Sequence, residues 1–420
     1  MLVMDPFKLN GFKGIKIMKY PLATESWDEK EINAACDVIK SMMCTMGEKC
    51  KKYEQEFANF FGSKYAVFSN SGSSANLLMI ASLMYRHNGP KLREGDEVIV
   101  PAVSWATTYY PLHQYGLISC FVDIDKDTLN IDVDKIEQAI TPKTKAILAV
   151  NLLGNPNNFD KLQEICKNYN LILLEDNCES MGATYNGKQC GTIGLMGTFS
   201  SFFSHHMSTI EGGVTLTNDE ELYQIMVSLR AHGWTRGLPD KNFVHDKDGV
   251  KFNDLFRFVL PGYNLRPNEV FAALGLEQLK KLPQFVEDRK QNAEFFRLEM
   301  DYLQSKYPKM FTTQSVTPNA EPSWFGFAFV LDNELKGKRL EIVDALSKSN
   351  IESRPIVAGN FVKNPVIKFM KTRTSGTLDV ANHIDEDGLF IGNNQGNIRE
   401  QIRYFAETFD KIIEEILAKS

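Results

Sequence analysis

Two adjacent histidines in the segment 199–213, FSSFFSHHMSTIEGG, are the residues whose types most directly suggest chemistry. A neutral imidazole accepts a proton near neutral pH, so His205 or His206 could act as a general base, and imidazole also binds metal ions. Neighbouring strand residues point to opposite faces, and no HxH or HxxxH spacing is present, so the pattern disfavours a metal site. No lysine occurs between Lys188 and Lys241. The segment therefore offers a base without an amine nucleophile, with a structural histidine pair as the alternative.

A second candidate is the stretch NSGSSAN at 70–76, where small residues lead into the apolar run LLMIASLMY. The start of a helix presents free backbone N–H groups and the positive end of the helix dipole, which together attract a phosphate. Ser73 and Ser74 add hydroxyl groups. The stretch is compatible with a phosphate-binding turn, and on this motif alone a simple helix N-cap is the more common explanation.

Two further residues follow expected strands. Asp176 ends the run LILLED, and a buried carboxylate there needs a partner, for which the N–H⁺ of a pyridine ring is suitable. Trp105 follows the run DEVIVPAVS and could stack on a planar ring. Helix capping by Asp176 and core packing by Trp105 are the alternative explanations.

Buried strands must place these side chains. Short apolar runs rich in Val, Ile, Leu and Phe predict strands over 96–104, 117–125, 144–154, 170–177, 197–203 and 212–217. Segments 133–140 and 159–169 are predicted as crossover helices. This alternation is typical of an α/β fold with a mainly parallel sheet covered on both faces, and ligands bind beyond the carboxyl ends of such strands.

After residue 265 the pattern changes to a long helix over 268–307, an aromatic strand over 323–331, a helix around 337–349 and a final helix near 397–418. We therefore expect a large domain, residues 1–264, with an N-terminal arm, and a smaller C-terminal α+β domain, residues 265–420. Segment 236–253 is expected to be a surface loop.

Composition narrows the class of protein. The 420 residues carry a formal net charge of −6, which disfavours a protein that coats nucleic acid. The seven cysteines are an odd, scattered set that suits reduced thiols. No run approaches the ~20 apolar residues of a membrane helix, and the first 22 residues contain no secretory signal. We expect a cytoplasmic protein with no membrane partner.

Six stretches in their order along the chain resemble the PLP-dependent sugar aminotransferase family, which acts on nucleotide-linked keto sugars: NSGSSAN, DEVIVPAVSWATT, LLEDNCESMGATYNGKQCGTIG, STIEGGV, RAHGWTR and GYNLRPNEVFAALGLEQLKKL. The resemblance runs from about residue 19 to the C-terminal helix. It implies an aspartate-aminotransferase-like fold, the type I fold of PLP enzymes, and pyridoxal 5′-phosphate (PLP) as cofactor.

The resemblance also implies a role for His205. In the family a lysine six residues before the Glu-Gly-Gly turn holds PLP covalently, and this position is His205. The branch with this replacement resembles 3-dehydratases of nucleotide-linked keto-deoxy sugars. It implies that glutamate converts PLP to its amine form, PMP, and that His205 then moves the proton at cofactor C4′ while the sugar loses its C3 hydroxyl.

The other site residues follow from the resemblance by position. Ser73, Ser74 and Ser200 would hold the cofactor phosphate, Trp105 would stack on its ring, and Asp176 would pair with its pyridine nitrogen. Glu179 would lie near the ring substituents. Asn264 would reach the phosphate of a neighbouring copy, which implies a homodimer. Arg236 and Arg354 are candidates for the nucleotide diphosphate of the sugar or the carboxylate of glutamate, with surface solvation as the alternative for both.

Three residues depart from the better-known dehydratases: Phe203, Ser204 and Ile210 stand where those carry a proline, a small residue and a glycine. A relative that uses an iron–sulfur cluster needs C-terminal cysteines, which this chain lacks, so that redox version is disfavoured. Two alternatives to a dehydratase remain open from the sequence: an atypical transaminase that makes an amino sugar, and a cofactor-binding protein without catalysis.

Overall fold

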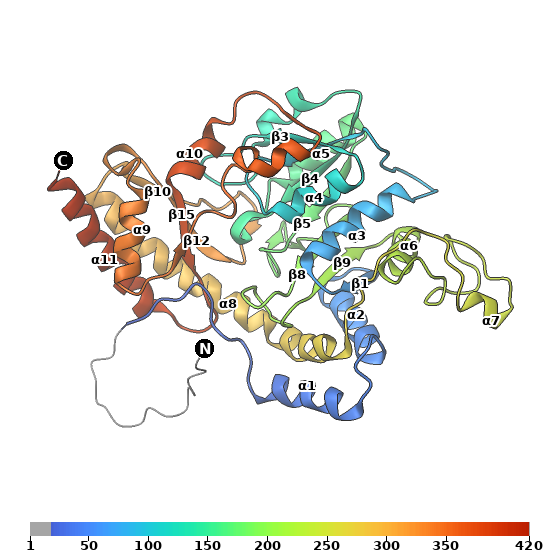
Figure 1. Cartoon of the computed structure of the whole chain (residues 1–420). Coiled ribbons are helices and arrows are strands. Elements are labelled where there is room, and N and C mark those ends of the chain that lie inside the picture. Colours follow the sequence, from blue (N-terminus) through green and yellow to red (C-terminus); the bar gives the residue numbers. More distant parts are fainter. Residues whose placement is uncertain (1–17, 420) are drawn as a thin grey trace.

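A twisted, mostly parallel sheet is the centre of the computed structural model, which describes residues 18–419 (Figure 1). Within this range its eight strands lie in the order β1-β9-β8-β5-β4-β2-β3-β14. Neighbours from β8 to β14 are parallel, whereas β9 pairs antiparallel with both β1 and β8. The strands are β1 (Tyr65–Ser69), β2 (Glu97–Pro101), β3 (Ile118–Val122), β4 (Thr144–Val150), β5 (Ile172–Asp176), β8 (Met196–Ser200), β9 (Gly213–Thr217) and β14 (Thr372–Thr374). The predicted strands and the mainly parallel sheet are confirmed.

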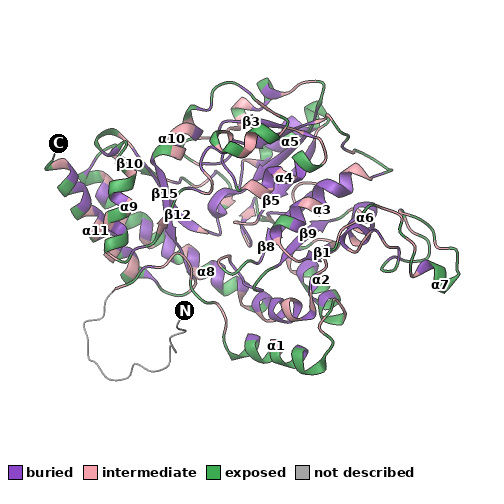
Figure 2. Cartoon of the chain, in the orientation of Figure 1, coloured by how far each residue is buried: buried purple, intermediate pink, exposed green. Residues whose placement is uncertain are grey.

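Side chains of the central strands alternate between two apolar layers, because successive strand residues point to opposite faces. Val98 and Val100 of β2 pack beneath α3 (Gly72–Met84), α4 (Ala106–Gln114) and α6 (Glu220–Arg230). Ile99 points the other way, into the layer under α5 (Phe159–Tyr169). Both faces are thus covered, and the buried residues concentrate in this sandwich (Figure 2).

The prediction of a crossover helix over 133–140 is wrong. This segment forms two short 3₁₀ turns, η1 (Val133–Lys135) and η2 (Glu137–Ala139). Val133, Ile136 and Ile140 are β-branched, and Pro142 disfavours helical backbone at the residue before it. The segment is therefore too short and too stiff for an α-helix, and α5 alone forms as predicted on this side.

The C-terminal part begins with the long helix α8 (Glu269–Lys306), which continues through Pro283. An antiparallel sheet in the order β10-β12-β15-β13 packs against it, with α9 (Arg339–Lys348) and α11 (Arg399–Leu417) on the outside. Its strands are β10 (Phe311–Thr313), β12 (Gly326–Leu331), β13 (Ser353–Arg354) and β15 (Gly388–Gly392). The chain also returns to the large sheet, since β14 pairs with β3. The boundary between residues 264 and 265 stays a prediction.

Short elements complete the described chain. They are α7 (Lys251–Asp254), α10 (Asp379–Asp387), the strands β6 (Thr184–Tyr185), β7 (Lys188–Gln189) and β11 (Ala320–Glu321), and the 3₁₀ turns η3 (Leu152–Gly154), η4 (Asn333–Leu335), η5 (Phe361–Lys363) and η6 (Pro365–Phe369). The segment expected as a surface loop, 236–253, is irregular except for the start of α7. Within residues 18–419, no helix combines the length and apolar character that crossing a membrane requires.

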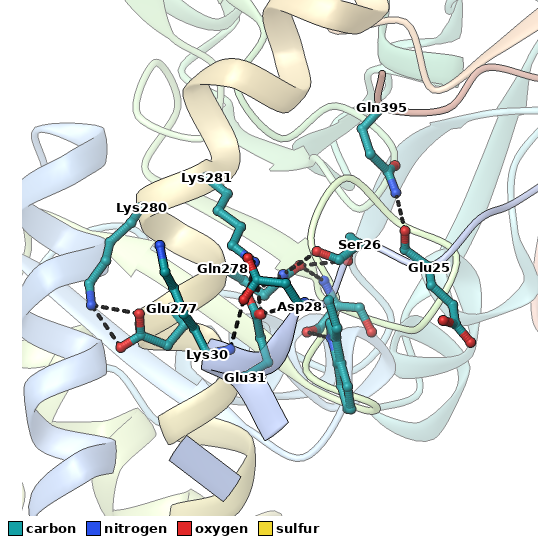
Figure 3. Close-up of polar contacts among 12 residues, drawn as sticks. Glu25, Ser26, Asp28, Lys30, Glu31, Glu277, Gln278, Lys280, Lys281 and Gln395 are labelled. Atoms are coloured by element: carbon teal, nitrogen blue, oxygen red, sulfur yellow. Dashed lines mark hydrogen bonds and ion pairs between the residues drawn. The ribbon is translucent and has the colours of Figure 1, made fainter. Parts of the chain in front are cut away.

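The N-terminal segment joins the two parts of the molecule. Tyr20 donates from its hydroxyl to the carbonyl of Gly392 in β15, and the chain then leads to α1 (Glu29–Ser41) and α2 (Glu48–Phe61) on the other side of α8. Buried Glu31 of α1 accepts from Gln278 Nε2 at 2.8 Å and from Lys281 of α8 (Figure 3). The first seventeen residues of the predicted arm lie outside the described residues.

Candidate active site

The Asp176 carboxylate lies at the carboxyl end of β5, where it is almost fully buried. Its Oδ2 accepts from Asn76 Nδ2 at 2.9 Å and from the Thr108 hydroxyl at 2.8 Å, and its Oδ1 accepts from the Cys178 N–H at 3.2 Å. Asn76 Oδ1 accepts from Thr198, which fixes the orientation of the amide. Asp176 is thus an acceptor held by three donors at the edge where ligands bind in this type of sheet.

Helix α3 begins beside the same strand ends. Ser71 is its N-cap and accepts from the Ser74 N–H at 3.1 Å, while the Ser74 hydroxyl donates to Asn70 at 2.6 Å. A Cβ on Gly72 would lie 2.6 Å from the Ser200 Cβ, so glycine is what allows Ser200 to approach the helix start. The N-cap explanation therefore describes Ser71, and the structure also brings Ser200 to the N-terminus of α3.

Trp105 precedes α4 and leaves 59% of its surface exposed. Within the described residues its ring forms no aromatic or cation–π contact, so the core-packing explanation does not hold. Thr108, one turn further along α4, reaches Asp176. A free aromatic face therefore stands one helical turn from the buried carboxylate.

Glu179 follows Asp176 by three residues. Its Oε2 accepts from the Leu153 N–H at 3.0 Å. Burial raises the pKa of Glu179 to about 7, with the negative charge of Asp176 adding to the effect. The side chain therefore titrates near neutral pH, close enough to Asp176 to feel its charge.

The histidine loop follows β8, and its two imidazoles differ. His206 is fully buried and its Nε2 lies 3.1 Å from the carbonyl oxygen of Ser323, so this nitrogen carries the proton. His205 is only half-buried, packs edge-on against Phe202 and Phe325, and keeps a buried Nδ1 without a hydrogen-bond partner in the described chain. The Nδ1 of His206 also lacks a partner, but its Nε2 is bonded to the turn, whereas neither ring nitrogen of His205 forms a hydrogen bond within the described chain.

Electrostatics keep both imidazoles neutral. Burial, followed by the nearby positive charge of Arg289, lowers the pKa of His205 to about 4 and holds the pKa of His206 well below its ordinary value. A neutral imidazole can accept a proton, and an imidazolium cannot. Among residues 18–419, no group of three or more His, Cys, Asp or Glu side chains is placed to hold a metal ion.

Asn264 and Arg236 line a separate cavity of 660 Å³, together with Trp234 and Arg266. Arg236 stacks on the Trp234 ring at 4.0 Å, and Asn264 Oδ1 accepts from Arg266 Nε at 3.0 Å. The cavity adjoins α3, since the N–H of Asn70 donates to the carbonyl of the residue after Asn264. Both predicted residues are exposed and face the cavity instead of the Asp176 carboxylate.

Arg354 belongs to neither group. It lies exposed on β13 and lines a 680 Å³ cavity with Lys19 and Glu352. Ser73 is exposed on the first turn of α3. The structure thus gathers Ser74, Ser200 and Asp176 around the start of α3, and it leaves Arg354 in the C-terminal part.

Several residues near the site escaped the sequence reasoning. Asn76 and Thr108 sit inside apolar helices, and a polar residue in such a run was the available signal. Arg289 falls seven residues after Leu282 on the apolar stripe of α8, which gives the same kind of signal. Ser323 and Phe325 contact the histidines only through the fold.

Comparison with known proteins identifies the family and several similar enzymes. The sequence profile of the DegT/DnrJ/EryC1/StrS aminotransferase family matches residues 25–410. A GDP-4-keto-6-deoxy-D-mannose 3-dehydratase of Yersinia pseudotuberculosis is 56% identical over 391 residues, which cover 92% of this chain and 98% of that protein. One of Escherichia coli O55:H7 is 52% identical, covering 93% of this chain and 99% of that protein.

Solved structures agree. A crystal structure of a GDP-4-keto-6-deoxymannose-3-dehydratase with a trapped PLP-glutamate geminal diamine is 52% identical, with a TM-score of 0.89, and the match covers 93% of this chain and 100% of that one. The predicted fold class, a large mainly parallel sheet with a smaller α+β part, is confirmed by this likeness.

Proposed function

The chain belongs to the DegT/DnrJ/EryC1/StrS aminotransferase family, and from this premise we propose that it removes the C3 hydroxyl of a nucleotide-linked 4-keto-6-deoxy sugar. The cofactor is PLP, which glutamate converts to PMP, and the product is a 4-keto-3,6-dideoxy sugar for a surface polysaccharide. The observation that carries the proposal is His205: a neutral imidazole with a free nitrogen stands where the resemblance expects the lysine that holds PLP covalently. The first substrate to test is GDP-4-keto-6-deoxy-D-mannose, because the relatives at 52–56% identity are named as dehydratases of this sugar nucleotide.

The donor set fits the cofactor. Asp176 supplies a carboxyl group suited to the pyridine N–H⁺, and the exposed face of Trp105 is suited to the ring. The start of α3, with Ser73, Ser74 and Ser200, supplies N–H and hydroxyl donors suited to the phosphate. When bound, PLP supplies the electron sink that makes loss of the C3 hydroxyl possible.

His205 performs the proton step in this proposal. Imidazole forms no stable covalent bond with an aldehyde of this kind, so the side chain is limited to taking and returning the proton at cofactor C4′. Without a lysine amine at this position, displacement of an amino sugar from the cofactor is not assisted. Overall, the sugar loses one oxygen atom, glutamate becomes 2-oxoglutarate, and its nitrogen leaves as ammonia, which balances atoms and electrons.

The active form in this proposal is a homodimer in the cytoplasm. Asn264 and Arg236 line a cavity together with Trp234, and the exposed rings of Phe256 and Phe258 lie beside Arg236 and Trp234. Contributing Asn264 to the phosphate of a second copy would account for its exposure. Arg236 and Arg354 would bind the diphosphate of the sugar nucleotide or the carboxylate of glutamate. The boundary at residues 264 and 265 separates the two proposed domains.

A product assay tests the function. Purified protein is incubated with PLP, glutamate and GDP-4-keto-6-deoxy-D-mannose, and the sugar nucleotide is analysed by mass spectrometry while free ammonia is measured. A product that lacks the C3 oxygen, with ammonia and 2-oxoglutarate formed in equal amounts, supports the proposal. A product that has gained nitrogen without release of ammonia assigns the chain to the transaminases. With no turnover, the absorbance spectrum after addition of glutamate alone separates a wrong sugar, where PMP forms, from a protein without catalysis.

A further inference from the structure

Arg289 of α8 is a buried cation whose hydrogen bonds are made to backbone carbonyl groups. It is 2% exposed, and its Nη1 donates to the carbonyl oxygens of Phe325 at 3.2 Å, of Trp324 at 3.4 Å and, more closely, of Asn393. No carboxylate forms an ion pair with it in the described part of the chain, and its Nε lacks a partner. Burial lowers the pKa of Arg289 to about 10, so the group is charged at neutral pH. A buried charge without a counter-ion is unfavourable for stability alone, which invites a functional explanation.

The segment that Arg289 holds, residues 323–325, is the segment against which both histidines pack. The Ser323 carbonyl accepts from His206, and the Phe325 ring centroid lies 5.3 Å from that of His205. Trp324 between them has a φ of 51°, a left-handed conformation that a bulky residue adopts only when its surroundings enforce it.

The same segment is fixed from the side of the large sheet. The N–H groups of Ser323 and Phe325 donate to the carbonyls of Gly154 and Leu153 at 2.9 Å each. A Cβ on Gly154 would lie 2.5 Å from the Trp324 nitrogen, so glycine is required for this approach. Asn393 closes the arrangement by donating to the Trp324 carbonyl at 2.9 Å. The turn therefore has one geometry, in which its carbonyls converge on the Arg289 guanidinium.

We propose that Arg289 is a positioning residue for the histidine loop: by holding the carbonyls of Trp324 and Phe325 it fixes the turn on which His205 and His206 rest, and so sets the direction of the His205 ring. The inference rests on the proposed function, in which His205 is the base. Arg289 itself touches carbonyl groups of the protein and acts through the turn.

The positive charge of Arg289 also affects the pKa of both histidines, which can be measured. The charged or titratable groups that act on His205 and His206 are Arg289 of α8 and the two imidazoles themselves, while the turn contributes only uncharged groups. Removing the positive charge therefore raises the pKa of both imidazoles, and a base with a higher pKa becomes protonated at a higher pH. The titration thus reports the charge of Arg289, and the turnover of a variant that keeps this charge reports the geometry of the turn.

The test uses the full-length protein with three variants. Arg289→Met removes the charge and the hydrogen bonds, Arg289→Lys keeps the charge but not the planar fork, and Arg297→Met, on the exposed side of the same helix, is the matched control. The pKa of each histidine is read from the exchange of its ring C2 hydrogen with deuterium over a pH series, with fragment ions in the mass spectrometer separating His205 from His206. Turnover in the product assay and thermal unfolding are measured on the same samples.

For Arg289→Met we expect the His205 and His206 titrations to move to higher pH by about one pH unit and turnover to fall at least ~10-fold, with KM for the sugar nucleotide little changed. For Arg289→Lys we expect titrations close to those of the wild type and turnover reduced several-fold. Should Arg289→Met fail to fold, Arg289→Lys carries the test. Unchanged titrations in a folded Met variant, or wild-type turnover in the Lys variant, would overturn the proposal. A wild-type protein that neither turns over the sugar nor forms PMP from glutamate would reject the proposed function instead, while the titrations would still report on Arg289.

Discussion

The two sides of the candidate site are built differently. On the side of the sheet, Asp176 accepts three hydrogen bonds and its donors Asn76 and Thr108 come from buried helices. On the side of the histidine loop, polar atoms of His205, His206 and Ser323 are buried without any partner among the described residues. Satisfied groups give a rigid binding surface, whereas unsatisfied buried groups are costly and persist where a ligand or a reaction uses them.

The difference extends to charge. Burial and the charge of Arg289 keep the histidines neutral, while hydrogen-bond donors surround Asp176. We infer that the side around Asp176 is suited to hold a cationic ring nitrogen, and that the histidine loop is suited to exchange a proton. Replacing residues on one side at a time should therefore separate binding from turnover.

The largest effect is expected from His205→Lys, which places an amine on the loop side. We expect PLP to be trapped covalently and dehydration to fall by about 10²–10⁴-fold, the usual contribution of a positioned proton-transfer group. Absorbance and intact mass after borohydride reduction detect the covalent bond, and the product assay detects the loss. Replacing His206 by lysine serves as the neighbouring control, and a covalent bond formed there but not at position 205 would reassign the two histidines.

Asp176→Asn is expected to have the next largest effect and acts on the sheet side. The new amide presents N–H groups to the donors Asn76 and Thr108 and carries no charge for a pyridinium, so we expect PLP affinity and turnover both to fall by about 10–100-fold. Titration of the cofactor-free protein with PLP, followed by absorbance, measures the affinity. Full affinity in a folded variant would show that Asp176 does not hold the ring.

The third prediction concerns the pH dependence of stability. The pKa of His205 is about 4 in the folded chain and about 6.5 when unfolded, so the unfolded chain binds more protons between these values and stability is lost as pH falls from about 6.5 to 4. Between pH 7 and pH 4.5, the free energy of unfolding should decrease less in His205→Asn than in the wild type, by on the order of 1–2 kcal/mol. Urea unfolding at the two pH values measures this difference.

Titration of Glu179 has the opposite effect on the pH dependence of stability, at pH values near those of His205. Its folded pKa of about 7 lies above the unfolded value, so its contribution to stability grows as pH falls from about 7 to 4.5. Acidification should therefore stabilise the Glu179→Gln variant less than it stabilises a chain that keeps Glu179. In His205→Asn, by contrast, acidification should destabilise the protein less than in the wild type. Equal slopes in the two variants would contradict the assignment of opposite electrostatics to the two groups.

The smallest effect is expected from Trp105→Ala. Since the ring is largely exposed and free, its removal should weaken PLP binding by about three- to tenfold and leave thermal stability unchanged. Tyr302→Ala, which removes an exposed ring from α8 far along the chain, is the control. A clear loss of stability with normal PLP affinity would return Trp105 to a structural role.

Most of the sheet could be predicted because its strands are continuous apolar runs, as the fully buried residues of β2 and β5 show. The short turns η1 and η2 could not, since a pattern of eight residues fits an α-helix until β-branching and Pro142 are weighed against it. The return of β14 to the large sheet escaped prediction for a different reason: pairing between residues 119–121 and 372–374 leaves no local signal.

The sequence by itself determined which chemical groups are present: a histidine in place of a lysine six residues before Glu211, an aspartate at a strand end, and small residues at the start of a helix. These follow from residue types at short spacing, which the chain carries locally. Only the tertiary structure decided that His206 bonds the turn and His205 does not, because that depends on Ser323, more than one hundred residues away. It likewise decided that Arg289 is buried beneath the loop, since burial and electrostatic surroundings arise only when distant segments pack together.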